Sequence, residues 1–188
     1  MCGIIGYCGP KPTAQVLLEG LKRLEYRGYD SAGICVAEAG RLALFKRQGK
    51  IRELAAQVPG GLSGASGIGH TRWATHGEVN DLNAHPHVDC KAFLAIAHNG
   101  IIENHTALKR KLIEEGHVFA SETDSEVIAH LIEKYYTGDL MEAVRRALAL
   151  LQGTYGIVCL HRDHPGLLVA VQTHDSIGAL QQRQRPPN

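Results

Sequence analysis

Met1-Cys2-Gly3-Ile4-Ile5-Gly6 begins the chain and places a cysteine directly behind the initiator methionine. Once that methionine is removed, Cys2 carries a thiol and a free α-amine, whose ordinary pKa of about 7.7–8.0 suits proton transfer near neutrality. A thiolate is a strong nucleophile, so one residue supplies both nucleophile and general base. Ile4 and Ile5 indicate a buried strand that anchors this end of the chain. Many chains begin Met-Cys by chance, so the rest of the sequence has to decide whether the cysteine is catalytic.

The composition is that of an ordinary globular domain. The 188 residues suit one domain, with 44% apolar and 21% charged residues. Lys plus Arg number 20 and Asp plus Glu 19, so no strong field attracts nucleic acid or an anionic membrane. No run approaches the roughly 18 apolar residues of a membrane span, and no signal-peptide pattern is present. We therefore expect no nucleic-acid partner, no membrane partner and a cytoplasmic protein.

The cysteines and histidines do not indicate a disulfide framework or a metal site. The five cysteines are odd in number and form no C-x-x-C pair, which fits a reducing compartment that keeps Cys2 free. His76, His85 and His87 are close in sequence, but no acidic or cysteine ligand recurs at zinc-like spacing. We expect no metal and no cofactor.

Apolar periodicity predicts sheets covered by helices. Strands are expected at 3–8, 31–37, 42–46, 66–71, 92–97, 154–160 and 167–171, and helices at 13–25, 51–58, 104–115, 123–135 and 139–152. Thr123 and Glu126 have capping-box spacing, and Asp139 is the expected N-cap of the last helix. Strands, two neighbouring helices and further strands are typical of a layered α+β domain.

Residues 172–188 differ in character from the rest of the chain. They contain four glutamines, two arginines and a Pro-Pro pair, with few apolar side chains. Such a composition disfavours both a strand and a packed core. We expect a folded domain at 2–171 and an unordered tail at 172–188, which would leave 167–171 as an exposed edge strand.

Two Gly-rich segments follow predicted elements and carry charged and aromatic residues. Residues 24–33, LEYRGYDSAG, end a helix in a turn that is either functional or a plain capped helix end. Residues 67–77, GIGHTRWATHG, place Arg72 and Trp73 just past a strand. The guanidinium of Arg72 could hold a carboxylate through two parallel hydrogen bonds. Alternatively, Trp73 covers the edge of the core and Arg72 stacks on it.

Two further segments could bind the remaining groups of an amino acid. Asn99-Gly100 after a strand is first a hairpin signal, but a side-chain amide and a backbone N–H could also converge on one oxyanion. Asp124 precedes a helix, where acidic residues are expected from the helix dipole alone, and it could hold an ammonium group. A cysteine nucleophile, a carboxylate clamp, an oxyanion pair and an ammonium partner together fit glutamine best.

These segments also resemble a known family. Cys2-Gly3-Ile4-Ile5-Gly6 and residues 24–33, 69–77, 98–104 and 122–126 are similar to the class II glutamine amidotransferases. Within that class they resemble the glutaminase domains of the glucosamine-6-phosphate synthase family, over a stretch from Cys2 to about Ala170. The resemblance implies an αββα four-layer sandwich of the N-terminal nucleophile hydrolase type, with Cys2 at the end of a central strand.

The resemblance also implies a role for each candidate residue. Cys2 is the nucleophile, and its own α-amine is the general base. Asn99 and Gly100 form the oxyanion hole. Arg72 binds the α-carboxylate of L-glutamine, and Asp124 binds its α-ammonium group.

The remaining candidates are implied to support these groups. Trp73, Thr75 and His76 lie on the loop that closes over glutamine. Arg27 and Gly28 support the cysteine terminus. The implied reaction is attack on the glutamine amide, loss of ammonia and hydrolysis of the thioester to glutamate.

The sequence departs from the family in two respects. The sugar-phosphate isomerase half, which uses the ammonia to make glucosamine 6-phosphate, is expected to be absent, so it would act only as a partner in trans. After 167–170 the family continues into a Gly-Ser-Pro hairpin and further strands, whereas this chain reads Val171-Gln172-Thr173-His174. We therefore expect the sandwich to be incomplete at its C-terminus.

Two other functions remain open on the sequence. The chain could be another N-terminal-cysteine amidotransferase or amide hydrolase. It could also be a truncated fragment that binds glutamine or a partner chain without turnover.

Overall fold

The computed structural model describes residues 2–62, 64–173 and 178–181. The elements follow in this order: β1 Gly3–Cys8, α1 Thr13–Leu24, the 3₁₀ helix η1 Glu25–Arg27, β2 Ser31–Glu38, β3 Arg41–Gln48, α2 Ile51–Gln57, β4 Ser66–Arg72, β5 His87–Val88, β6 Leu94–Ile102, α3 His105–Glu114, α4 Glu126–Tyr135, α5 Leu140–Leu148, β7 Gly153–His161, β8 Leu167–Gln172 and β9 Gly178–Gln181. None of the helices in these ranges is long and apolar enough to cross a membrane.

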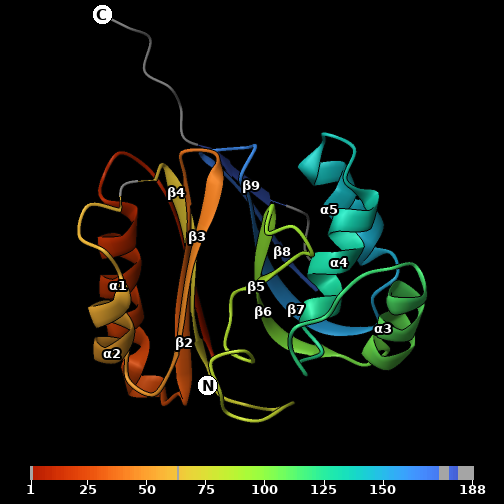
Figure 1. The fold of residues 1–188 in the computed structure, drawn as a ribbon, viewed down its shortest axis with the longest axis horizontal. Helices are drawn as coiled ribbons and strands as arrows, with labels where there is room; N and C mark the ends of the chain where they lie inside the picture. The colour runs from red at the N-terminus through yellow and green to blue at the C-terminus, as the bar shows by residue number, and fades with distance from the viewer. Residues whose placement is uncertain (1, 63, 174–177, 182–188) are drawn as a thin grey trace, which may run out of the picture.

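The strands form two antiparallel sheets that face each other. The first has the order β1-β4-β2-β3 and the second the order β5-β6-β7-β8-β9. Figure 1 shows α1 and α2 on the outer side of the first sheet and α3, α4 and α5 on the outer side of the second. The layers are therefore helix, sheet, sheet and helix, which confirms the predicted α+β sandwich.

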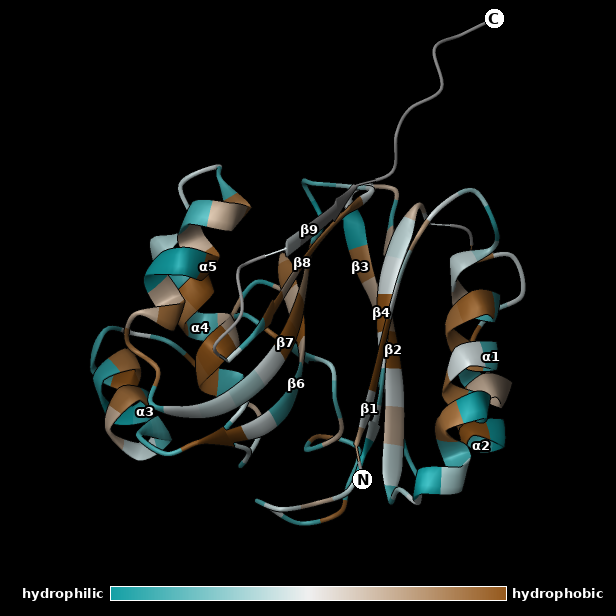
Figure 2. Cartoon of the chain, turned by 180° about the vertical axis from the view of Figure 1, so that it is seen from behind, coloured by the Kyte–Doolittle hydropathy of each residue, from teal (hydrophilic) through white to brown (hydrophobic). Residues whose placement is uncertain are grey.

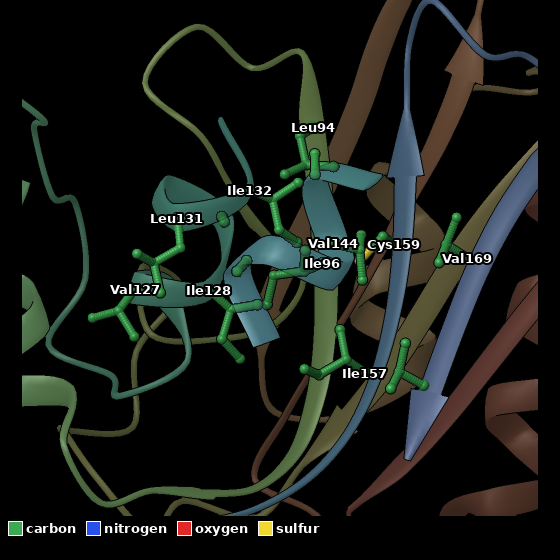
Figure 3. Close-up of a cluster of buried hydrophobic side chains, with 14 of the residues drawn as sticks. Leu94, Ile96, Val127, Ile128, Leu131, Ile132, Val144, Ile157, Cys159 and Val169 are labelled. Carbon is green, nitrogen blue, oxygen red and sulfur yellow. The ribbon is translucent and has the colours of Figure 1, made fainter. Parts of the chain in front are cut away.

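Each pair of neighbouring layers has its own buried apolar cluster. Leu17, Leu21 and Ile34 belong to the cluster between α1, α2 and the first sheet. Ile128, Ile132 and Val144 belong to the largest cluster, between the second sheet and α3, α4 and α5 (Figure 3). Small residues dominate the cluster between the two sheets, which contains Cys35, Ala37, Ala95, Ala97, Ile68, Leu160 and Leu168. Hydrophobic residues accordingly line the inner sides of the layers in Figure 2.

Most predicted elements are present, but two local signals are wrong. Asn99-Gly100 is not a hairpin turn, because both residues lie inside β6 and pair with Gly156 and Tyr155 of β7. The capping box is also wrong. The Glu126 carboxylate accepts hydrogen bonds from Ala120 N and Ser121 N, at 2.7 Å each. These bonds hold the loop before α4 and are not those of a capping box.

The C-terminal segment is partly ordered, contrary to the sequence-based expectation. Residues 178–181 form β9, which pairs antiparallel with β8 from Ala170↔Gly178 to Leu167↔Gln181. The expected exposed edge at 167–171 is therefore wrong, because the backbone of β9 covers β8. Residues 174–177 and 182–188 of the predicted tail lie outside the described residues.

The register of the first sheet determines where Cys2 lies. Gly3 of β1 pairs with Thr71 of β4, so Cys2 lies beside the end of β4, next to Arg72 and Trp73. Among the described strands β1 is at one end of its sheet, so the expected central strand is wrong. Figures 1 and 2 both show the start of β1 at one end of the sandwich, between the two sheets.

Candidate active site

The thiol of Cys2 is held by the backbone that follows β4. Trp73 N donates a hydrogen bond to Cys2 Sγ at 3.2 Å, and the thiol lies 3.6 Å from Trp73 O. The next residue is also fixed, because Gly3 N donates to Thr71 Oγ1 at 3.1 Å. Cys2 is half-buried, so its sulfur is both positioned and accessible. Both properties are required of a nucleophile.

Asp30 fixes the turn that carries Trp73. Its backbone N donates to Arg72 O at 2.8 Å, and its carboxylate accepts a hydrogen bond from Ala74 N at 2.5 Å. Ser31 Oγ donates to the other carboxylate oxygen at 2.9 Å. The turn after β4 is thus braced from β2, the strand that lies beside it.

Gly28 supports Trp73 and does not line the cavity. Its φ of +73° is a conformation that side chains disfavour, and a Cβ there would lie 2.8 Å from the Trp73 ring. The ring therefore packs directly on the Gly28 backbone, while Trp73 remains 55% exposed. Arg27 is exposed beside it, and its Nε donates to Tyr26 Oη at 3.2 Å. Gly28 thus packs on Trp73, whose backbone contacts the Cys2 thiol, and support of the cysteine terminus by residues 27–28 stays a prediction.

Arg72 holds the loop that follows it. Its guanidinium donates to Glu78 O at 3.2 Å and also to the carbonyls of His76 and Gly77. The alternative in which Arg72 stacks on Trp73 is therefore wrong. The residue is 4% exposed. Burial lowers the pKa of Arg72, and the negative charges of Asp30, Cys2 and Asp124 oppose that shift, so acidic groups surround the cation.

A hydrogen bond between the two sheets orients Asn99. His70 Nε2 on β4 lies 2.9 Å from Asn99 Oδ1 on β6. An amide oxygen only accepts, so His70 donates, and the amide NH₂ of Asn99 is directed away from His70. His70 stays neutral, because burial lowers its pKa to about 4. Its ring stacks on His85 with centroids 4.3 Å apart.

Gly100 has to be a glycine in this strand. Its φ is +133°, and a Cβ would lie 2.0 Å from Thr154 O. No side chain fits between β6 and β7 at this point. The backbone of Gly100 therefore borders the cavity directly beside the Asn99 amide.

Asp124 is buried and is held by the last residue of β6. Its Oδ2 accepts a hydrogen bond from Ile102 N at 2.8 Å, and the residue is 4% exposed. Ser125, its neighbour, has Oγ 2.7 Å from His98 Nδ1. The carboxylate of Asp124 is thus fixed at the cavity wall with its second oxygen available to a cation.

One cavity of about 850 Å³ brings nearly all of the predicted residues together. Thr75 is exposed at its rim, and His76 is half-buried with a ring 5.6 Å from that of His105. Of the ten predicted site residues, Gly28 alone is missing from the lining, which includes Cys2, Arg27, Arg72, Trp73, Thr75, His76, Asn99, Gly100 and Asp124.

Sequence reasoning missed three residues that position this site. His70 orients Asn99, Asp30 braces the turn at Trp73, and Thr71 binds Gly3 N. His70 and Thr71 lie inside the segment 67–77 and Asp30 inside 24–33, so the segments were identified but these roles were not. Their roles depend on pairing between strands, which the local sequence does not contain.

A thiol at the start of a strand in an αββα sandwich, facing an asparagine amide across one cavity, defines an N-terminal nucleophile amidotransferase. The glutamine amidotransferase domain family matches residues 70–180, and the chain belongs to this family. Among solved structures, glutamine phosphoribosylpyrophosphate amidotransferase from B. subtilis has a TM-score of 0.77 at 29% identity, covering 92% of this chain and 37% of that one.

The curated relatives are more specific. Glutamine–fructose-6-phosphate aminotransferase (isomerizing) of Caldanaerobacter subterraneus is 51% identical over 173 residues, which are 92% of this chain. The protein of the same name from Pyrococcus horikoshii is 55% identical over 172 residues, which are 88% of this chain. The chain spans about 28% of the length of these relatives.

Proposed function

We propose that this chain hydrolyses L-glutamine to glutamate and ammonia through a thioester on Cys2. The observation that carries this proposal is the convergence of one thiol, two amide-type donors, one buried cation and one buried carboxylate on a single cavity. Arg72 and Asp124 match the opposite charges of an α-amino acid, and Asn99 and Gly100 match the oxyanion of an attacked amide.

The reaction begins with proton transfer within Cys2. After removal of Met1, the α-amine takes the thiol proton and Sγ attacks the side-chain carbonyl carbon of glutamine. The carbonyl oxygen becomes an oxyanion that accepts hydrogen bonds from Asn99 Nδ2 and Gly100 N. The α-amine then gives its proton to the departing amide nitrogen, the C–N bond breaks, and ammonia leaves a thioester behind.

Water completes the cycle. The α-amine removes a proton from a water molecule that attacks the thioester carbonyl, and the same oxyanion donors stabilise the second tetrahedral intermediate. The C–S bond breaks, the proton returns to sulfur, and glutamate is released. Trp73, Thr75 and His76, on the loop tied to Arg72, cover the bound amino acid and limit access of water.

In a longer protein, the ammonia would be transferred to fructose 6-phosphate to give glucosamine 6-phosphate. This part of the proposal follows the name of the curated relatives. It requires a sugar-phosphate isomerase domain or chain as a partner. The free thiol of Cys2 requires a reducing compartment, and on that ground we place the protein in the cytoplasm.

A coupled assay for ammonia and glutamate tests the proposal. We expect stoichiometric release of both from glutamine by the purified chain and none by Cys2→Ala. Cys8→Ser is the matched control, because that thiol donates to Gly166 O at 2.6 Å and lies outside the cavity lining, so activity should be kept. Equal ammonia release by Cys2→Ala would refute the mechanism.

The same assay separates the alternative functions. Binding of glutamine by calorimetry without ammonia release from a processed, correctly folded chain would favour the non-catalytic function. Hydrolysis of acylated amines in preference to glutamine would favour a different amide hydrolase.

A further inference from the structure

Four potential metal ligands converge outside the active-site cavity. Cys90 follows β5, His117 follows α3, and His130 and Glu133 lie on α4. Their ligand atoms, one sulfur, two imidazole nitrogens and one carboxylate oxygen, all lie within 4.8 Å of one another. Three segments that are distant in sequence thus present four donor atoms to one point. Figure 1 shows α3 and α4, which carry or precede three of these residues.

Three of the distances between these atoms match the edges of a tetrahedron around zinc, and a fourth is shorter. Cys90 Sγ lies 3.6 Å from His117 Nδ1 and 3.5 Å from His130 Nδ1. Glu133 Oε2 lies 3.4 Å from His130 Nδ1 and 2.9 Å from His117 Nδ1. Ligands bound at about 2.0–2.3 Å in tetrahedral geometry are about 3.3–3.6 Å apart. Of these four pairs, the His117–Glu133 pair is the one that would have to open, by a few tenths of an ångström, and the remaining two pairs lie within 4.8 Å.

The ring of His130 lies between two carboxylates. Its Nδ1 faces Glu133, and its Nε2 lies 3.5 Å from Glu126 Oε1, with the ring fully buried. With a metal at Nδ1, an N–H on Nε2 would face Glu126 Oε1. Metal-binding histidines commonly donate their second N–H to a carboxylate in this way.

The surroundings hold the ligands in place. Asp89 Oδ1 accepts hydrogen bonds from Phe93 N and Leu94 N, at 2.7 Å each, which fixes the loop that carries Cys90. Val118 N donates to Cys90 Sγ at 3.4 Å, and the Phe119 ring packs on His130 with centroids 4.2 Å apart. These contacts position Cys90 and His130 within the cluster.

We propose that Cys90, His117, His130 and Glu133 form a structural Zn²⁺ site. A thiolate, two imidazoles and one carboxylate suit this borderline-soft ion, and four protein ligands leave no position open for substrate. The metal would fasten the loop after β5 and the end of α3 to α4. Because Asp124 lies just before α4, the site would stabilise the segment that carries this cavity residue.

Metal binding can be measured on protein that carries Cys2→Ala, so that the active-site thiol contributes no ligand. After chelator treatment and dialysis, we expect one equivalent of Zn²⁺ per chain by elemental analysis, and an increase in Tm with Zn²⁺. Co²⁺ should give a thiolate-to-metal charge-transfer band. Adding Cys90→Ser should abolish that band, and Cys90→Ser or His117→Gln should weaken Zn²⁺ binding by more than the roughly 10–100-fold typical of an outer-shell change.

Cys8→Ser is the matched control and should bind Zn²⁺ and Co²⁺ like the parent protein. His117→Gln changes a second ligand on a different segment, so it keeps the test valid should Cys90→Ser fold poorly. Failure to take up an equivalent of Zn²⁺ would overturn the proposal and leave a cluster of ion pairs. Equal uptake by the parent, Cys90→Ser and His117→Gln would also overturn it, because the ion would then be bound elsewhere.

Discussion

Asn99 shows how a single residue of this site depends on another. Its amide oxygen lies 2.9 Å from His70 Nε2, so a side chain of the opposite sheet sets the direction of its NH₂ group. The proposed oxyanion donor therefore depends on both residues. The sequence indicated Asn99 as a candidate, but His70 could not be assigned because the contact joins strands of two different sheets.

Asn99→Ala should lower kcat by about 10²–10³, which is about 2.7–4 kcal/mol, with a smaller change in KM. The reason is that the amide donates to an oxyanion present only during the reaction. Steady-state kinetics of glutamine hydrolysis check this. A change in KM alone would mean that Asn99 contacts the ground state.

His70→Ala should lower kcat more than KM, because an unanchored Asn99 amide no longer points steadily at the oxyanion. His70→Gln keeps an N–H donor and should recover part of the loss. The double variant His70→Ala/Asn99→Ala should be little slower than Asn99→Ala alone. Fully additive losses would show that His70 acts independently of Asn99.

Arg72→Lys should raise KM for glutamine by about tenfold or more, since an ammonium group cannot make two parallel bonds to a carboxylate or hold the carbonyls of 76–78. Kinetics with glutamine and with 4-aminobutanamide, which lacks the α-carboxylate, test the assignment. The second substrate should show little further loss in the variant. Simple addition of the two losses would exclude a carboxylate contact.

At the scale of helices and strands, apolar periodicity predicted most of the fold. β1 has the predicted bounds, and Asp139 is the N-cap of α5, with its side chain accepting from Glu142 N at 3.1 Å. The two-residue strand β5 was missed because it is too short to show a period. β9 was missed because backbone pairing with β8 outweighs the unfavourable composition of the segment.

The strand β9 should stabilise the second sheet. A chain ending at residue 173 should lose about 2 kcal/mol, or about 4–8 °C in Tm, because the pairing with β8 is removed and an edge is exposed. A chain ending at residue 181 is the control and should melt like the full chain. Thermal unfolding and size-exclusion chromatography measure both effects, and identical behaviour of the two truncations would contradict this role.

Spacing along the chain could not have revealed the cluster of Cys90, His117, His130 and Glu133. The candidate ligands in the sequence were His76, His85 and His87, which are close together along the chain. The cluster instead joins a loop, a helix end and a helix face, and only the packing of α3 against α4 brings them together. Candidate residues that lie together in one stretch of sequence were predicted, whereas a cluster assembled from several distant stretches was not.

For the molecule as a whole, buried histidines should make stability depend on pH. Burial lowers the pKa of His70 to about 4 and those of His85 and His87 well below 6.5. The unfolded chain therefore binds protons that the folded chain does not, and stability falls as the pH drops from about 6.5 toward 4.

Between pH 7.5 and pH 5, His70 alone should account for about 2 kcal/mol of lost unfolding free energy. Urea unfolding at the two pH values measures the change, and His70→Gln should reduce it by that amount. The pKa of Glu126 is lowered to about 2, so its contribution to stability is lost mainly below its ordinary pKa and changes little between pH 7.5 and pH 5. An unchanged pH dependence in His70→Gln would show that His70 has the same pKa in the folded and the unfolded chain.

The small residues between the two sheets have a mechanical consequence. Cys2 extends from one sheet and Asn99 belongs to the other, so the thickness of the sandwich sets the gap that the reacting carbonyl has to fill. Ala95 and Ala97 keep that thickness small. A misplacement of about 1 Å can cost a factor of about 10² in rate. A bulkier side chain at Ala97 would push the two sheets apart, and it would slow the reaction although every reacting group was still present.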